Sequence, residues 1–251
     1  MAKALGVDIG GTGIKAAVVD TVTGELLTDR VKMYTPKGGE PEAVVETVLE
    51  VIEKVGGLDD GVPVGVCFPA VVKHGRTMSA ANVSKRWIGL EAEALFEQSL
   101  GRNITFINDA DAAGYAELHY GAAKGQQGLV ILTTLGTGIG SAFLYDGVLI
   151  PNTELGHLQM HGDSAEVRAS YGAKERGDLS WAKWAERLQE YYAYLEALFS
   201  PDLFVVGGGV SKNSDDFLPL LNITTPLVPA VHRNNSGIIG AAALAAIGFH
   251  A

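Results

Sequence analysis

Cysteine is almost absent from this 251-residue sequence, which contains only Cys67. A single cysteine cannot form an internal disulfide, so a small scaffold held by disulfides is excluded. Cys67 lies in the apolar run from residue 64 to residue 69, which favours a buried core thiol over the alternative of a reactive cysteine. Proline is also scarce at 9 residues, and the 47% hydrophobic content predicts a folded chain with a substantial core.

Long hydrophobic runs and an excess of positive charge are missing as well. No segment approaches the ~20 consecutive apolar residues of a membrane span, and no apolar stretch follows a basic segment near residue 1. We therefore expect a cytoplasmic protein. The 19 Lys and Arg residues against 29 Asp and Glu residues give a net charge of −10, which argues against general nucleic-acid binding. An anionic substrate stays compatible with this charge, because backbone amides in glycine turns bind phosphate.

Glycine, in contrast, is abundant, and two of its clusters share one pattern. An apolar strand at residues 4–7 leads into a turn at residues 8–13 and a second strand at residues 14–19. The same order recurs at residues 129–135, 136–140 and 141–145. The letters Gly-Thr-Gly-Ile are identical at residues 11–14 and 136–139. Two matching hairpins half a chain apart predict a duplicated unit rather than two chance clusters.

Helix and strand patterns alternate after each hairpin. We expect helices at residues 41–55, 90–100 and 180–199 and strands at residues 62–68, 104–107 and 203–206. These elements predict an α/β fold with two domains, residues 1–107 and 108–251, and a site in the cleft between them. A small-residue helix at about residues 237–249 is expected to pack back on the first domain. The aromatic face of the 180–199 helix suits core packing or a dimer contact.

A phosphate site is the chemistry that the glycine turns favour. Glycine permits positive φ and the close approach of ligand oxygens to exposed amides, and Thr12 and Thr137 add hydroxyls at the turns. Asp8 ends the first strand, where it can bind Mg²⁺ directly or through water. For either turn taken alone, the alternative to a phosphate site is a glycine turn that only connects the two strands of a hairpin.

A cluster of polar residues follows the strand at residues 104–107. Asn108, Asp109 and Asp111 lead into the start of an alanine-rich helix. Asparagine and aspartate are good N-caps, and a cap accounts for one of the three. We therefore expect another of them to act at a site, because phosphoryl transfer needs a carboxylate that takes the proton of the attacking hydroxyl.

Together these segments resemble the ROK family of sugar kinases, which have the actin-like ATPase, ribonuclease H-like duplicated fold. The similar segments are residues 8–15, 108–111 and 135–140, and residues 207–212 resemble the family's nucleotide-side motif. The resemblance implies that Asp109 is the general base on the sugar 6-hydroxyl and that Asn108 binds a neighbouring hydroxyl. It implies phosphate binding by Asp8, Gly10, Gly11, Thr12, Gly13, Lys15, Thr137, Gly138, Gly208 and Gly209.

Residues 154–157 are similar to the sugar-binding motif of the family. The resemblance implies that Glu154 and His157 bind sugar hydroxyls, and acceptor carboxylates beside a neutral imidazole suit an array of hydroxyls. Glu166, Ser79 and Asn82 are further sugar-binding residues by the same resemblance. By residue type alone, a polar surface or packing role is the alternative for His157, and a plain turn position is the alternative for Asn82.

Most ROK members carry a cysteine cluster after this motif, which holds zinc together with the histidine. This chain lacks those cysteines, so we expect no zinc site. Three features resemble the polyphosphate glucokinase subgroup of the family. They are the missing cysteines, residues 201–209 and the helix that begins near Ser180. The resemblance implies phosphoryl transfer from polyphosphate to the 6-hydroxyl of glucose with Mg²⁺, giving glucose 6-phosphate, in a homodimer.

Two alternatives to this function remain. An ATP-dependent glucokinase or glucomannokinase has the same turns, whereas a polymeric donor needs a basic path, for which the candidates are Lys15, Lys73, Lys85, Arg86, Lys212 and Arg233. Scattered surface charge is the other interpretation of these six residues. A non-catalytic sugar sensor is the alternative of a different class. The family's sugar-responsive repressors carry a DNA-binding domain before the sugar domain, and the first strand at about residue 4 and the acidic charge disfavour that class.

Overall fold

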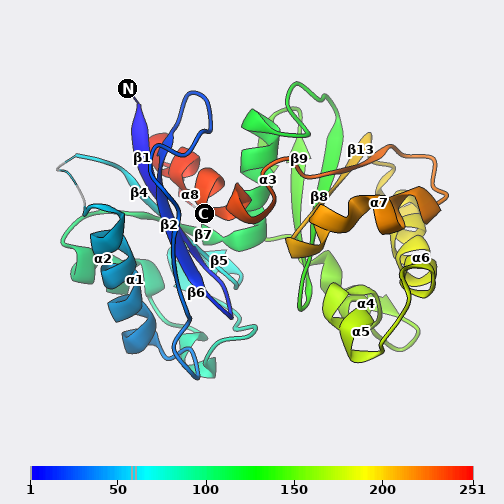
Figure 1. The fold of residues 1–251 in the computed structure, drawn as a ribbon, viewed down its shortest axis with the longest axis horizontal. Coiled ribbons are helices and arrows are strands. Elements are labelled where there is room, and N and C mark those ends of the chain that lie inside the picture. The colour runs from blue at the N-terminus through cyan, green and yellow to red at the C-terminus, as the bar shows by residue number, and fades with distance from the viewer. Residues whose placement is uncertain (1, 58, 60, 251) are drawn as a thin grey trace. The chain divides into compact units, whose positions relative to one another are not determined.

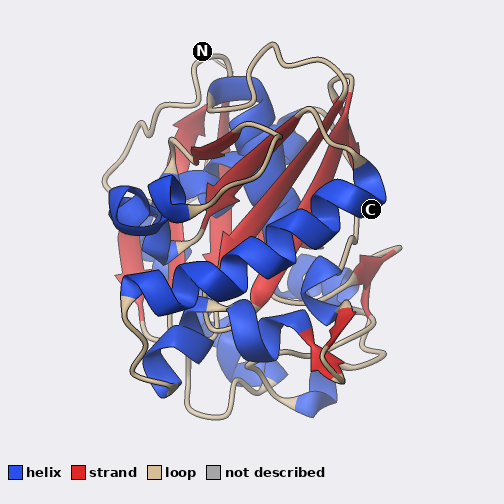
Figure 2. Cartoon of the chain, turned by 90° about the vertical axis from the view of Figure 1, so that its right-hand side faces the viewer, coloured by secondary structure: helices blue, strands red, loops and turns tan. Residues whose placement is uncertain are grey.

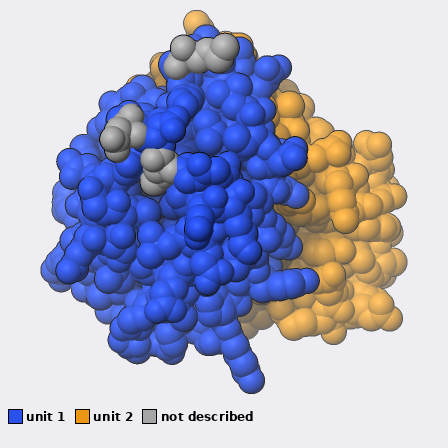
Figure 3. Space-filling view, turned by 60° about the vertical axis from the view of Figure 1, so that its left-hand side comes forward, with its two compact units in different colours: residues 1–116, 235–251 blue, residues 117–234 orange. Residues whose placement is uncertain are grey.

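The computed structural model describes residues 2–57, 59 and 61–250, and the chain forms two compact units. Unit 1 comprises Met1–Ala116 and Asn235–Ala251, and unit 2 comprises Glu117–Asn234 (Figure 3). The first change from unit 1 to unit 2 lies within helix α3 (Asp109–Tyr120). Among the described residues, no helix combines the length and the apolar composition of a membrane span.

A five-stranded mixed sheet forms the centre of unit 1 (Figure 1). Its strand order is β3-β2-β1-β4-β7, in which β2 is antiparallel to β1 and β3, and β4 is parallel to β1 and β7. The predicted strands near residues 4, 14, 62 and 104 are confirmed, and β3 is an addition. The bounds are β1 (Lys3–Ile9), β2 (Ile14–Asp20), β3 (Val31–Met33), β4 (Val64–Phe68) and β7 (Thr105–Asn108).

Unit 2 contains a second five-stranded sheet with the same topology. Its order is β10-β9-β8-β13-β14, with β9 antiparallel to both neighbours and β13 parallel to both of its own. This shared order and direction of strands confirm the duplicated α/β fold predicted from the two hairpins. The bounds are β8 (Leu129–Leu135), β9 (Ile139–Tyr145), β10 (Val148–Ile150), β13 (Leu203–Gly207) and β14 (Leu227–Pro229).

Helices cover both faces of the sheet of unit 1 (Figure 1). On one face lie α1 (Pro41–Val55) and α2 (Ala92–Leu100), whose apolar side chains form a core with alternate residues of β1 and β4. The predicted ends of both helices are confirmed, because Gly56 and Gly101 adopt the left-handed conformation that stops a helix. The other face carries α8 (Ser236–Ala246).

Helix α8 lies directly on the backbone of β1 and β4. A Cβ atom added to Gly6 would lie 1.9 Å from the carbonyl oxygen of Ile238, and one added to Gly65 would lie 1.9 Å from that of Ala241. Both glycines are therefore required by close packing of a helix on strands. Gly237 brings the first turn of α8 against the side chains of Asp8 and Cys67. The first turn of α8 therefore packs on the carboxyl ends of β1 and β4.

The long helix α6 (Trp181–Phe199) supplies much of the core of unit 2. Figure 2 shows it crossing in front of the sheet. The Ser180 hydroxyl caps its first turn by accepting a hydrogen bond from the Lys183 amide at 3.2 Å. Trp184, Leu188 and Tyr191 are buried against the sheet, so the core-packing interpretation of this helix is confirmed.

Short elements complete both units. In unit 1 these are β5 (Val72–Lys73), β6 (Arg76–Thr77) and the 3-10 turn η1 (Lys85–Trp87). In unit 2 they are η2 (Leu155–His157), β11 (Gln159–Met160), β12 (Asp163–Ser164), α4 (Ala165–Ala169), α5 (Tyr171–Arg176), η3 (Gly209–Asn213), α7 (Ser214–Phe217) and η4 (Leu218–Leu220). The turn η5 (Arg233–Asn235) spans the second change between the units.

Candidate functional site

The carboxyl ends of three parallel strands bring polar groups of unit 1 together. Strand pairing sets Asp8 of β1 opposite Cys67 of β4, and Phe68 of β4 opposite Asn108 of β7. Cys67 is buried, as predicted, and its thiol lies 3.7 Å from Oδ1 of Asp8. Burial first, and then the charges of Asp8 and Asp109, raise the pKa of the Cys67 thiol well above its ordinary value. The buried thiol and the two carboxylates therefore belong to the same edge of the sheet, where β1, β4 and β7 end.

Asn108 is the N-cap of α3. Its Oδ1 accepts hydrogen bonds from the amides of Ala110, at 2.8 Å, and Asp111, at 3.0 Å. Its side-chain amide donates to the carbonyl oxygen of Ala70 at 3.0 Å, which leaves one N–H of that amide for a ligand. Asp109 follows as the half-buried first residue of α3. The cap is thus assigned to Asn108, and Asp109 remains the candidate for chemistry.

The first glycine turn, residues 10–13, is closed by a hydrogen bond from the Gly10 amide to the Gly13 carbonyl at 3.0 Å. Gly11 and Thr12 are exposed at its tip, where their backbone groups can meet a ligand. Nζ of Lys15 donates to Oδ2 of Asp8 at 2.7 Å, so the two predicted phosphate-site side chains form an ion pair. This turn therefore has exposed amides beside a neutralised carboxylate.

The second glycine turn, residues 136–138, is one residue shorter than the first. Ile9 pairs with Ile14 across the first hairpin, whereas Leu135 pairs with Ile139 across the second. Thr137 is exposed at the tip. Gly208 adopts φ 83° beside this hairpin, and a Cβ there would lie 2.5 Å from the carbonyl oxygen of Leu135. Gly209 follows as an exposed residue. The predicted phosphate-binding residues of unit 2 therefore lie at one end of the second sheet.

Close packing, rather than the positive φ expected from the sequence, explains Gly11, Gly13 and Gly138, whereas a Cβ on Gly136 would meet no atom within 4 Å. Among the described residues, the glycines with positive φ do not include Gly10, Gly11, Gly13, Gly136 or Gly138. A Cβ on Gly11 would lie 2.8 Å from Cβ of Asn82, one on Gly13 would lie 2.7 Å from Cε of Lys32, and one on Gly138 would lie 2.4 Å from a carboxylate oxygen of Glu166. Each turn is therefore pressed against a side chain from elsewhere in its own unit.

The predicted sugar-binding side chains of unit 2 form one cluster. Nδ1 of His157 lies 3.9 Å from Glu154, and Nε2 lies 3.8 Å from Glu166. Burial, together with the charge of Glu166, raises the pKa of the Glu154 carboxyl, and His157 partly opposes this shift. Glu166 also accepts a hydrogen bond from the amide of Ile139 at 3.1 Å, which ties this cluster to the end of the second glycine turn.

Two further predicted sugar-binding residues of unit 1, Ser79 and Asn82, lie in the loop before η1. The Ser79 hydroxyl accepts a hydrogen bond from the Val71 amide at 3.0 Å. Asn82 is exposed and adopts φ 60°, a conformation that asparagine tolerates better than most residues. Because Asn82 lies against Gly11, this loop adjoins the first glycine turn.

Arg86, one of the candidates for a basic path along the polymer, is already paired with carboxylates. This side chain forms ion pairs with Glu40 and Glu42, so its charge is already compensated. Lys85 donates to the carbonyl oxygen of Ala80 at 2.8 Å. Lys32, which the sequence did not single out, instead lies beside the first glycine turn. No local signal identifies Lys32, because β3 has only three residues and no hydrophobic period.

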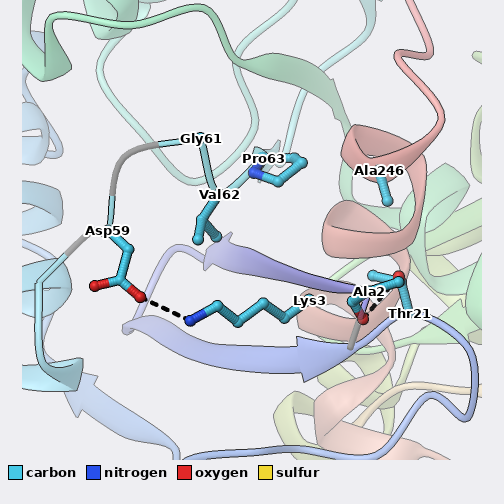
Figure 4. A pocket seen from close by; sticks show the side chains of 8 residues that line it. All are labelled: Ala2, Lys3, Thr21, Asp59, Gly61, Val62, Pro63 and Ala246. Carbon is cyan, nitrogen blue, oxygen red and sulfur yellow. Dashed lines mark hydrogen bonds and ion pairs between the residues drawn. The ribbon is translucent and has the colours of Figure 1, made fainter.

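A surface cavity of about 460 Å³ lies elsewhere in unit 1 (Figure 4). Its walls include Ala2, Lys3, Pro63 and Ala246, and Lys3 forms an ion pair with Asp59 at 2.7 Å. Lys3 begins β1, whereas Asp8 stands next to its last residue. The cavity is therefore at the opposite end of the strand from the glycine turn and contains none of the predicted site residues.

Comparison with known proteins identifies the family. The model of the ROK family matches residues 4–174. The chain is 48% identical over 238 residues to polyphosphate glucokinase of Mycobacterium tuberculosis (strain CDC 1551 / Oshkosh), covering 94% of this chain and 89% of that protein.

Solved structures agree with this match. The inorganic polyphosphate/ATP-glucomannokinase of Arthrobacter sp. strain KM superposes with a TM-score of 0.96 at 50% identity, covering 99% of this chain and 100% of that one. A ROK family glucokinase of Streptomyces griseus, solved in complex with glucose and AMPPNP, has a TM-score of 0.82 at 25% identity, with 98% and 100% covered. The protein described here belongs to the ROK family.

Proposed function

We propose that this chain is a polyphosphate glucokinase, which transfers the terminal phosphoryl group of inorganic polyphosphate to the 6-hydroxyl of glucose. The observation that carries the proposal is the 48% identity, over 94% of the chain, to a relative named polyphosphate glucokinase. The similarity to a structure named polyphosphate/ATP-glucomannokinase supports ATP as a second donor. We expect ATP to be the poorer of the two. Glucose 6-phosphate is the product.

Asp109 is the general base of the proposed reaction. Its carboxylate takes the proton of the glucose 6-hydroxyl while that oxygen forms a bond to the terminal phosphorus. The bond from this phosphorus to the bridging oxygen breaks, and the polymer leaves one phosphate shorter. The position of Asp109 at the start of α3, beside the end of β7, supports this role, because groups at the carboxyl ends of parallel strands can converge on one ligand.

The remaining predicted residues bind the two substrates. Amides of the turns at residues 10–13 and 136–138, with the hydroxyls of Thr12 and Thr137, bind phosphate oxygens, and Gly208 and Gly209 extend the second of these sites. Glucose hydroxyls are bound by the cluster of Glu154, His157 and Glu166 and by Ser79, Asn82 and Asn108. His157 lies 3.9 Å from Glu154 and 3.8 Å from Glu166, and these distances support the binding of one sugar by all three side chains.

Magnesium fits the first glycine turn. Mg²⁺ is commonly bound by one or two carboxylates together with substrate phosphates, and Asp8 is a partly buried carboxylate beside that turn. Asp8 and the donor phosphates would hold the ion, directly or through water. Bound there, Mg²⁺ would offset negative charge on the phosphates. The ion pair from Lys15 to Asp8 positions the same carboxylate.

Initial rates of glucose 6-phosphate formation test the function. Glucose is supplied with polyphosphate, with ATP at equal phosphoryl equivalents, or with no donor. We expect the polyphosphate rate to exceed the ATP rate and no product without donor. Turnover with ATP alone would contradict the polyphosphate proposal, and glucose binding without turnover on either donor would support the sugar sensor instead.

The raised pKa of Glu154 predicts how glucose affinity depends on pH. Because the pKa is raised, this carboxyl takes up its proton at a higher pH than an ordinary glutamate when the pH falls. A protonated Glu154 loses acceptor strength for sugar hydroxyls, so KM for glucose should rise by about tenfold as the pH falls towards the ordinary carboxyl range. In Glu154→Gln, KM should be high at every pH. Glu175→Gln, an exposed change on α5, serves as the control and should follow the wild-type profile.

A cytoplasmic homodimer completes the proposal. Tyr145, Val148 and Ile150 are exposed apolar residues on or beside the edge strand β10, which supports a contact with a second copy. Light scattering of the purified protein measures its molar mass, and a monomer at working concentration would contradict this part.

A further inference from the structure

Three charged residues lie in one row across the sheet of unit 1. Asp8 of β1 pairs with Lys15 of β2, and Lys15 pairs with Lys32 of β3. Directly paired residues of neighbouring strands point to the same face, so these three side chains share a face of the sheet. The row ends at the sheet edge, because β3 is the outer strand.

The charges in this row are not equally compensated. Lys15 is paired with Asp8 at 2.7 Å, so these two cancel. Lys32 is exposed and, within the described part of the chain, takes part in no ion pair. Its ammonium lies 5.9 Å from the ring of Tyr34, which is 85% exposed. Lys32 therefore adds a net positive charge next to the ion pair of Asp8 and Lys15.

Lys32 also forms one wall of the first glycine turn. A Cβ added to Gly13 would lie 2.7 Å from Cε and 3.7 Å from Cγ of Lys32, so the stem of this lysine passes over Gly13. The Thr35 hydroxyl, just after β3, donates to the carbonyl oxygen of Gly10 at 2.5 Å. The segment that carries Lys32 is thereby fixed to the turn itself.

The opposite wall of the turn is the loop of Asn82. Gly11 faces Asn82, whereas Gly13 faces Lys32. Asn82 is a glucose-binding residue in the proposed function, so the reacting end of the donor belongs on the side of Gly11. The remainder of the donor then extends towards Gly13 and Lys32.

We propose that Lys32 binds the phosphoryl donor beyond the first glycine turn and favours inorganic polyphosphate over a nucleotide; this inference rests on the proposed function. Every unit of polyphosphate carries negative charge, whereas the phosphates of ATP end at an uncharged nucleoside. A lysine ammonium is a single charge on a flexible side chain, which suits a polymer whose phosphates can bind in many equivalent positions. The two-point hydrogen bonding of an arginine guanidinium is not required. Lys32 thus acts in donor binding and specificity, without a role in proton transfer.

Lys32→Gln is the variant that tests this inference, with Lys54→Gln as its matched control. Lys54 is an exposed lysine of the same unit in the last turn of α1. For Lys32→Gln we expect KM for polyphosphate of defined length to rise about five- to tenfold, kcat to stay within about twofold, and KM for ATP to change by less than about threefold. Lys32→Arg should recover most of the polyphosphate affinity. Lys54→Gln should leave both KM values within about twofold.

Binding of end-labelled polyphosphate, followed by fluorescence anisotropy without glucose, separates this inference from the proposed function. Wild-type protein that binds the polymer but does not turn it over contradicts the proposed function, while weaker binding by Lys32→Gln still supports the assignment of Lys32. Unchanged KM and unchanged polymer affinity in Lys32→Gln would overturn the inference. An equal rise in KM for ATP and polyphosphate would overturn the specificity part of it.

Discussion

Replacing Asp109 with asparagine is expected to lower turnover of glucose by a factor of about 10² to 10⁴ while glucose binding persists. Asparagine keeps the size of the side chain but cannot take the proton of the 6-hydroxyl. Asp109 follows the last residue of β7, and the parallel strands β1, β4 and β7 end at the same edge of the sheet, where β1 leads into the first glycine turn. Single-turnover rates and glucose titration by calorimetry measure the two quantities separately.

Loss of a helix-terminal charge must be distinguished from loss of the base. Asp109 lies in the first turn of α3, where a carboxylate stabilises the helix dipole by about 0.3–1 kcal/mol. Glu93→Gln removes a half-buried carboxylate from the first turn of α2, which carries none of the candidate site residues, and should leave turnover unchanged. Turnover of Asp109→Asn within about threefold of wild type would eliminate Asp109 as the base.

Replacing Gly65 with alanine is expected to destabilise the protein by about 1–3 kcal/mol, because the added methyl overpacks a close helix-on-strand contact. The new Cβ would lie 1.9 Å from the carbonyl oxygen and 2.4 Å from the carbonyl carbon of Ala241 in α8. Backbone atoms cannot rotate aside as a flexible side chain can, so α8 must shift away from β4. Thermal and urea denaturation of the variant measure the loss.

Gly207→Ala is the matched control for this substitution. Gly207 also lies in a central parallel strand, but an added Cβ would meet its nearest neighbours at 3.6 to 3.7 Å, which is ordinary contact. We expect its free energy of unfolding to change by less than about 0.5 kcal/mol. Equal stability of Gly65→Ala and Gly207→Ala would contradict the close packing of α8 on β4.

The long elements were predictable because their signals are local. Helix α1 has Pro41 at its start, an apolar face at helical spacing and glycines after its end, and each feature is read within a few residues. The Ser180 cap and the aromatic period identified α6 in the same way. The two hairpins were found because their turns share letters, and the two sheets then have one topology.

The contacts of the candidate site were less predictable, because they join residues that are distant in sequence. Strand β3 is too short to show a period, so Lys32 carried no signal. The ion pairs of Arg86 with Glu40 and Glu42 span 46 and 44 positions, so the sequence alone left Arg86 as a candidate for the basic path. Gly138 could be recognised as part of a turn, but only the structure shows that a side chain at this position would clash with Glu166.

The route of the chain through the two units has a consequence for biosynthesis. Unit 2 is one continuous segment, Glu117–Asn234, whereas the sheet of unit 1 lacks one of its covering layers until α8 has emerged from the ribosome. Since domains generally fold as units during translation, unit 2 can mature on the nascent chain while the earlier-synthesised strands β1 and β4 still expose the face that α8 covers. The part of the protein made first is therefore completed last.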